Sequence, residues 1–299
     1  MRAGRHSMRT VSKSTGILLL GLLLPYRVGA AQIVEESFNV PMRVTAASGA
    51  DIRQAIVVTV IRAAGTKPQP FLVLHHGRAS SAAGFARMGR ADYPANSRYF
   101  AERGFVVLVP TRIGYGVSGG PDIEYTGNCQ FKRYAAGVAP AVSETRQLLA
   151  FAATLPYVDV TRGIVVGESF GGLIAMAAAS SDIPGVIATV NISGGDGGDS
   201  LRHADEPCRP DQLRETFAAY GRSNRVPTLW MYSRNDREWG PAYPRQWYTA
   251  FSETGGRGSF VNLPADKNNG HFIFNRNAVA WHPAFEAFLA QLGFAAPAR

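Results

Sequence analysis

A serine flanked by two glycines, in Gly167-Glu168-Ser169-Phe170-Gly171, is the segment of this chain best suited to nucleophilic chemistry. The apolar run GIVV at 163–166 precedes it and a stretch rich in Ala, Leu and Met follows, which predicts a strand, a tight turn and a helix. Glycines beside such a turn allow the sharp bend that exposes the serine oxygen above a sheet. The pattern predicts Ser169 as the nucleophile and the N–H group of Phe170, at the helix start, as a donor to an oxyanion.

A second segment, Gly116-Val117-Ser118-Gly119-Gly120, has the same spacing in a different setting. It lies in a polar loop, Pro121 follows it directly, and no helix-forming stretch comes next. We therefore expect Ser118 to be structural. A dinucleotide site is the other common use of a glycine-rich turn between a strand and a helix. That site requires G-x-G-x-x-G, and GESFGG at 167–172 lacks the second glycine.

The acid and the base of a triad follow a serine on this kind of turn in the order Ser, acid, His. Asp236 comes just after the apolar run VPTLWMYS at 226–233, so it can reach the same sheet edge, although Asp is also a common turn residue. We predict Asp236 as the acid. The substitutes are three acidic residues in the preceding loop region, Asp205, Glu206 and Asp211.

Three of the six histidines follow the predicted nucleophile. His203 precedes the predicted acid in a polar loop, and His282 precedes a proline that is expected in the first turn of a helix over 283–293. His271 lies in a loop after the apolar run at 259–264, where one ring nitrogen can take the serine proton while the acid holds the other. This placement predicts His271 as the base.

The second oxyanion donor is expected in the loop after another apolar run, PFLVLHHG at 70–77. The backbone N–H of Arg78 is the predicted partner of the Phe170 N–H, with Gly77 and Ala79 as alternatives.

Three arginines fall in or beside loops that should lie over this edge, namely Arg78, Arg112 and Arg133. Any of them could pair with a carboxylate of a substrate. A solvated surface position is the more ordinary place for such a side chain, and we expect it for each. We expect His76 to stabilise its loop and to take no part in proton transfer.

Apolar runs alternate with helix-forming stretches along residues 31–299. Near-continuous apolar runs are typical of parallel strands buried on both faces. The order predicts one α/β domain with a mostly parallel central sheet and helices on both faces, and glycine-rich loops at 112–135 and 194–208 over the carboxyl edge. Strands are expected at 52–62, 70–77, 105–111, 163–169, 185–193, 226–233 and 259–264, and helices at 138–155, 171–180, 209–221, 242–254 and 283–293.

The first thirty residues read as a secretory signal, because four basic residues precede a short apolar run and small residues follow at 28–30. The run is too short to span a bilayer, so we expect a cleaved signal, a periplasmic or secreted protein and no stable membrane insertion. Five of the 31 basic residues lie in this segment, which leaves 26 against 22 acidic residues. That balance, without a basic run, gives no indication of a nucleic-acid partner.

The chain has two cysteines, Cys129 and Cys208, one in each of the two glycine-rich loops. In an oxidising compartment an even pair usually forms one disulfide, so we predict that they are joined. Two cysteines cannot form a structural zinc site alone, and no C-x-x-C is present, so we expect no metal.

Taken together, these motifs resemble those of the dienelactone-hydrolase-like family of α/β-hydrolases over about residues 50–295. The segments concerned are LHHG at 74–77, GYGVSGG at 114–120, GESFGG at 167–172, VPTLWMYSRND at 226–236, Gly240-Pro241 and NNGHFIF at 268–274. The resemblance implies the α/β-hydrolase fold and cofactor-free hydrolysis through an acyl-enzyme formed by Ser169, Asp236 and His271. Many of the namesake enzymes carry Cys as the nucleophile, where this chain has Ser.

The sequence therefore predicts a hydrolase of ester-type bonds in a small acyl substrate. A peptidase of the same fold and a non-catalytic binding protein are the alternatives. Neither the natural substrate nor the oligomeric state follows from the sequence.

Overall fold

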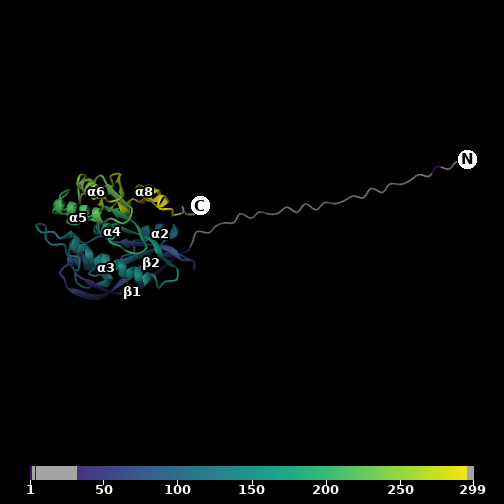
Figure 1. Cartoon of the computed structure of the whole chain (residues 1–299), viewed down its shortest axis with the longest axis horizontal. Helices are drawn as coiled ribbons and strands as arrows, with labels where there is room; N and C mark the ends of the chain where they lie inside the picture. Colours follow the sequence, from purple (N-terminus) through teal and green to yellow (C-terminus); the bar gives the residue numbers. More distant parts are fainter. Residues whose placement is uncertain (2–3, 5–31, 295–299) are drawn as a thin grey trace. The chain divides into compact units, whose positions relative to one another are not determined.

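The computed structural model describes residues 1, 4 and 32–294 and contains one sheet (Figure 1). Its strands are β1 (Ile33–Thr45), β2 (Asp51–Ala63), β3 (Gln69–His75), β4 (Val106–Thr111), β5 (Val158–Glu168), β6 (Val186–Ile192), β7 (Thr228–Ser233) and β8 (Gly258–Leu263). They lie in the order β1-β2-β4-β3-β5-β6-β7-β8. The β1–β2 and β2–β4 pairs are antiparallel, and the other neighbours are parallel.

Helices cover both faces of this sheet. They are α1 (Ala82–Arg87), α2 (Pro94–Glu102), α3 (Tyr134–Ala152), α4 (Phe170–Ala179), α5 (Pro210–Ser223), α6 (Tyr243–Glu253), α7 (Ile273–Arg276) and α8 (Ala278–Gln291), with 3₁₀ turns η1 (Gly116–Ser118) and η2 (Gly270–Phe272). Successive residues of a strand point to opposite faces. In β3, Phe71 and Val73 accordingly belong to the core cluster that also contains residues of α3, α4, α5 and α6. Leu72 and Leu74 belong to the cluster on the opposite face, which contains residues of α2, α7 and α8.

The parallel strands β3 to β8 end at one edge of the sheet, and the loops that follow them gather there. This edge carries the three segments in which the sequence places the triad. Ser169 follows β5, Asp236 follows β7, and His271 follows β8.

The predicted fold is confirmed, and the seven expected strands are all present. The strand β1 was not predicted: it is an edge strand whose side chains alternate between exposed and buried, so it has no continuous apolar run. The short helices α1, α2 and α7 were not predicted either. The expected helix start at Pro283 is wrong, because α8 begins at Ala278 and carries this proline in its interior.

The expected signal segment lies almost wholly outside the described residues. Within the part of the chain that the structure describes, no helix is both long and apolar enough to cross a membrane.

Candidate active site

The turn between β5 and α4 holds Ser169 in the backbone conformation φ 56°, ψ −123°. A positive φ is uncommon for a residue other than glycine, and such conformations are concentrated at functional sites. The positions on either side of it must be glycine, because a side chain would not fit there. A β-carbon on Gly167 would lie 1.9 Å from the carbonyl oxygen of Gly171, and one on Gly171 would lie 2.2 Å from that of His75. The Ser169 N–H is bonded to the carbonyl oxygen of Ile192 at the end of β6, at 2.9 Å, which fixes the turn on the sheet.

The loop after β3, residues 76–79, lies directly against this serine, and we call it the β3 loop. A β-carbon on Gly77 would lie 3.2 Å from the Cβ atom of Ser169. Phe170 is the first residue of α4, and the first N–H groups of a helix have no acceptor within the helix. The structure therefore places the β3 loop, which contains Arg78, against Ser169, and it places the Phe170 N–H at the start of α4.

His271 and Asp236 form a buried pair. The Nδ1 atom of His271 lies 3.1 and 3.0 Å from the two carboxylate oxygens of Asp236, so its N–H donates to that carboxylate. The His271 side chain is 7% exposed and that of Asp236 is fully buried. Burial alone would lower the pKa of His271, but the charge of Asp236 and its hydrogen bond outweigh burial and raise it.

Side-chain and backbone bonds hold the histidine loop on the aspartate loop. The Gly270 N–H donates to the carbonyl oxygen of Asn235 at 3.0 Å. The side-chain oxygen of Asn269 accepts from the N–H groups of Arg237 and His271, at 3.1 and 3.0 Å. Each loop thus carries one partner of the buried pair and also fixes the backbone of the other.

Trp239 connects this pair to the end of β6. Its indole N–H donates to the carbonyl oxygen of Ser193 at 2.8 Å, and its ring meets His271 edge-on at 5.4 Å between centroids. A β-carbon on Gly195 would lie 3.0 Å from the indole, and the Gly195 N–H donates to the carbonyl oxygen of Ser169 at 3.1 Å. A continuous set of contacts therefore runs from the serine turn to His271.

Glu168 is a buried carboxyl that the sequence interpretation passed over, although it lies inside the serine motif. Its Oε2 atom accepts from the Tyr93 hydroxyl and the Asn275 amide, both at 3.0 Å. Burial raises the pKa of Glu168, against the effects of His271 and these two hydrogen bonds.

The expectation of solvated arginines is wrong for Arg112 and Arg78. The Arg112 side chain is fully buried and forms a bidentate pair with Glu124, also fully buried, at 2.6 and 3.2 Å. Arg78 is 14% exposed in its side chain and bonds to both carboxylate oxygens of Asp122, at 2.9 and 2.5 Å. Both guanidinium groups thus have carboxylate partners within the chain. Arg133 is exposed, as expected.

The remaining candidates for the triad lie elsewhere or serve the fold. Ser118 is buried, with its hydroxyl bonded to the carbonyl oxygen of Thr111 and to the N–H of Val57, at 2.5 and 2.8 Å. His282 stacks on Tyr99 on the α8 side of the sheet. The other substitutes are exposed loop or helix residues, namely His203, Asp205, Glu206 and Asp211.

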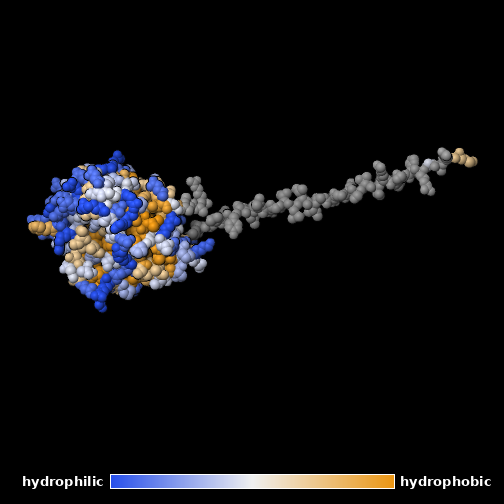
Figure 2. Space-filling view, viewed as in Figure 1, coloured by the Kyte–Doolittle hydropathy of each residue, from blue (hydrophilic) through white to orange (hydrophobic). Residues whose placement is uncertain are grey.

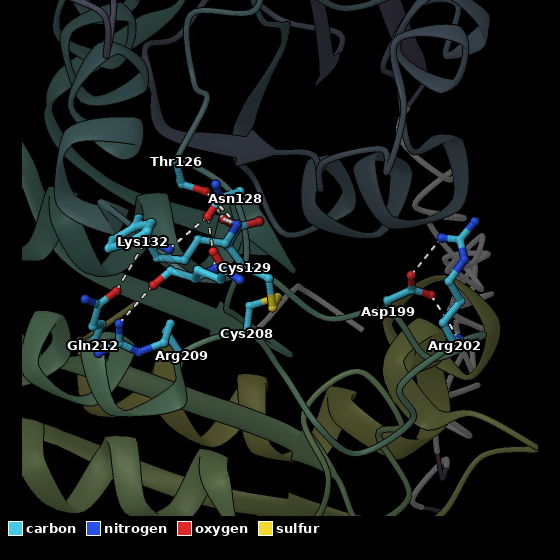
Figure 3. Close-up of a disulfide and its surroundings, with 12 residues drawn as sticks. Thr126, Asn128, Cys129, Lys132, Asp199, Arg202, Cys208, Arg209 and Gln212 are labelled. Carbon is cyan, nitrogen blue, oxygen red and sulfur yellow. Dashed lines mark hydrogen bonds and ion pairs between the residues drawn. A yellow bond between two sulfur atoms is a disulfide. The ribbon is translucent and has the colours of Figure 1, made fainter.

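A disulfide joins Cys129 to Cys208 and so connects the loop after β4 with the loop after β6 (Figure 3). Their Cα atoms lie 4.9 Å apart. Lys132 reaches from the first loop to Asp196 in the second, at 3.3 Å, and Arg209 donates to the carbonyl oxygen of Gln130 at 3.0 Å. The disulfide is therefore one of several connections between these two loops.

Exposed apolar side chains are concentrated on the segments that leave this edge. Within residues 32–294, five of the six large ones lie on segments that follow β4, β6 or β8: Val117, Tyr125, Phe131, Leu201 and Phe272. Figure 2 shows apolar groups separated by hydrophilic side chains on the face that it presents. An open pocket of about 510 Å³ lies between α1 and the loop after β4, with Arg78, Phe85 and Tyr125 in its wall.

Among residues 32–294, no group of three or more His, Cys, Asp or Glu side chains is arranged to hold a metal.

Residues 72–295 match a family model described as the alpha/beta hydrolase family. No match is found among curated proteins. The fold is similar to that of an acylaminoacyl peptidase, at a TM-score of 0.58 and 14% identity, over 85% of this chain but only 41% of the peptidase.

Two further solved structures are similar over most of both chains. One is assigned as a dienelactone hydrolase from Klebsiella pneumoniae, with a TM-score of 0.56, 14% identity and coverage of 87% of this chain and 98% of that one. The other is an acetyl xylan esterase from Paenibacillus sp. R4, with a TM-score of 0.55, 17% identity and coverage of 89% and 86%. At these identities the similarity shows a shared fold.

Proposed function

Because the chain belongs to the alpha/beta hydrolase family, we propose that it is a serine hydrolase that cleaves carboxylic ester-type bonds through an acyl-enzyme. The observation that carries the proposal is the buried His271–Asp236 pair on the same sheet edge as the strained turn of Ser169. A structural serine needs neither the positive φ nor a buried imidazole with a carboxylate behind it.

In the proposed reaction, His271 takes the proton of the Ser169 hydroxyl at Nε2 while the serine oxygen attacks the carbonyl carbon of the ester. The resulting oxyanion accepts hydrogen bonds from the N–H groups of Arg78 and Phe170. Collapse of this intermediate breaks the bond to the alcohol, which leaves with the proton from His271. Water then repeats the sequence on the acyl-enzyme and releases the acid. Asp236 holds the imidazole in the required tautomer and stabilises its charged form.

A peptidase on the same fold is the second candidate, since the acylaminoacyl peptidase is among the similar structures. The triad chemistry is common to both reactions. An alkoxide is a better leaving group than the anion of an amine, and an ester carbonyl is less stabilised by resonance than an amide carbonyl, so an ester makes the smaller demand on the same residues. The exposed apolar side chains on the segments that leave this edge also support a substrate with an apolar acyl or alcohol group.

Short-chain p-nitrophenyl esters and a fluorophosphonate probe test the proposal on purified protein. Wild-type protein should hydrolyse the esters and become labelled, and Ser169→Ala should lose both properties. Loss of a triad member typically costs on the order of 10⁴–10⁶ in kcat. Retention of ester hydrolysis by Ser169→Ala would refute the mechanism, and a wild-type protein without labelling or turnover would favour a binding role. Cleavage of peptide amides but not esters would favour the peptidase.

We also propose that the protein is exported, which the disulfide supports because such bonds persist in oxidising compartments. Mass measurement of protein recovered from outside the cytoplasm should show the loss of the first thirty residues or so. Recovery of the full-length chain in the cytoplasm alone would contradict this.

A further inference from the structure

One buried arginine is bonded to the peptide groups of the β3 loop. The guanidinium of Arg112 donates to the carbonyl oxygen of His76 at 2.8 Å and, more weakly, to that of Gly77 at 3.4 Å. The backbone N–H of Arg112 donates to Nε2 of His76 at 3.2 Å, which leaves the ring proton on Nδ1. That Nδ1–H donates to the carbonyl oxygen of Gly77 at 2.6 Å. Arg112 thus fixes both carbonyl groups, directly and through His76.

The direction of these carbonyl groups determines the direction of the next N–H groups. Every peptide bond of the described chain is trans, and in a trans peptide the C=O of one residue and the N–H of the next point in opposite directions. Because the Gly77 carbonyl faces Arg112 and His76, the Arg78 N–H faces away from them. Within residues 32–294, no protein acceptor is bonded to that N–H.

Glu124 keeps Arg112 in this position. Both side chains are fully buried, and the Tyr115 hydroxyl donates a further bond to Glu124 at 2.7 Å. A buried guanidinium without its carboxylate is strongly unfavourable, so the contacts of Arg112 with the β3 loop depend on Glu124. Most of the bonds that Arg112 makes do not serve secondary structure. They go to its counter-charge, Glu124, and to the loop beside Ser169.

We infer that the Arg112–Glu124 pair is a positioning element that directs the Arg78 N–H toward the oxyanion, and so sets the rate of acyl transfer without touching the substrate. This inference rests on the proposed function. The plain alternative is an ion pair that stabilises the fold and has no effect on the reaction.

The test uses a variant that removes both charges together, Arg112→Met with Glu124→Gln, so that no unpaired charge is left buried. The control is Arg62→Met with Glu36→Gln, which removes a half-buried ion pair of 3.3 Å between β1 and β2. Loss of a whole oxyanion donor typically lowers kcat by about 10²–10³. A donor that stays but is misdirected should cost less, about 10- to 100-fold in kcat, with KM changed by less than about threefold.

A trifluoromethyl ketone supplies a readout that a purely structural pair would not move. It forms an oxyanion on the serine, so its affinity should fall in parallel with kcat in the Arg112–Glu124 variant and stay unchanged in the control. Unchanged kcat and inhibitor affinity in the folded double variant would overturn the inference, as would an equal loss in the control. If the double variant does not fold, Arg112→Lys takes its place, because one ammonium cannot reproduce the bidentate pair and both carbonyl bonds.

Amide hydrogen exchange separates this inference from the proposed function. Exchange in the peptide that contains residues 76–79 should become faster in the Arg112–Glu124 variant and not in the control, whether or not the protein turns over an ester. Absence of Ser169-dependent hydrolysis would defeat the proposed function alone. Unchanged exchange in residues 76–79 would defeat the positioning role.

Discussion

Replacing Cys129 and Cys208 with serine should destabilise the protein strongly and impair catalysis only mildly. The disulfide closes a loop of about 80 residues, since its cysteines are 79 positions apart. In the chain-entropy model, such a closure removes about 15 cal/mol/K of entropy from the unfolded chain, or about 4.5 kcal/mol at 25 °C. For a chain of this size each kcal/mol changes Tm by about 2–4 °C, so the double variant should melt about 9–18 °C lower.

The effect on function should be smaller, because the two loops have other connections. Lys132–Asp196 and the bond from Arg209 to Gln130 join the same loops without the sulfur atoms. Neither the serine turn nor the His271–Asp236 pair lies in the loop that contains Cys129 or in the loop that contains Cys208. We therefore expect KM to rise by a few-fold while kcat stays within a factor of about two.

Calorimetry and ester kinetics on wild type and variant, with and without reductant, decide the matter. Reductant should lower the Tm of wild-type protein toward that of the double-serine variant and leave the variant unchanged. A wild-type protein that contains two free thiols after export would refute the predicted disulfide. An equal Tm of wild type and variant under oxidising conditions would refute the loop-entropy reasoning.

Four further outcomes are expected. Asp236→Asn should fold and lose about 10⁴ in kcat, because the imidazole then takes the wrong tautomer. The kcat/KM of wild-type protein should fall as the pH drops through the raised pKa of His271, because an imidazolium cannot take the serine proton. A pH profile that is flat from about pH 5 to 8 would contradict that role. Burial and the charge of Glu124 raise the pKa of Glu144 to about 8. The contribution of Glu144 to the free energy of unfolding should therefore be greatest below about pH 4.5 and should decline as the pH rises toward 8. Denaturant titrations of Glu144→Gln should show a weaker decline over this range. Ser118→Ala should lose about 1–3 kcal/mol in such a titration, because it leaves the Val57 N–H unpaired, and should keep its esterase activity.

The parts of the site that could be predicted are those that short segments determine. The glycines around Ser169 are required by contacts within the turn itself and with the neighbouring strand end, so their spacing carries the information. Asp236 and His271 could be located because parallel strands end at one edge, which turns chain order into spatial proximity. The strand β1 escaped prediction because an edge strand lacks the apolar run that marks a buried one.

Arg112 shows where such prediction stops. Its position after β4 suggested a solvated loop residue, and nothing near it in the sequence marks it as buried. Its charge is accommodated in the interior because Glu124, twelve residues later, returns to pair with it, and that return depends on the tertiary path of the chain. Motif residues such as Ser169 determine whether the proposed reaction can occur at all. Residues such as Arg112 and Glu124 determine how well the backbone donors point, and only the folded structure identifies them. Substitutions at Arg112 or Glu124 should therefore change the rate of hydrolysis by a protein that still carries every motif.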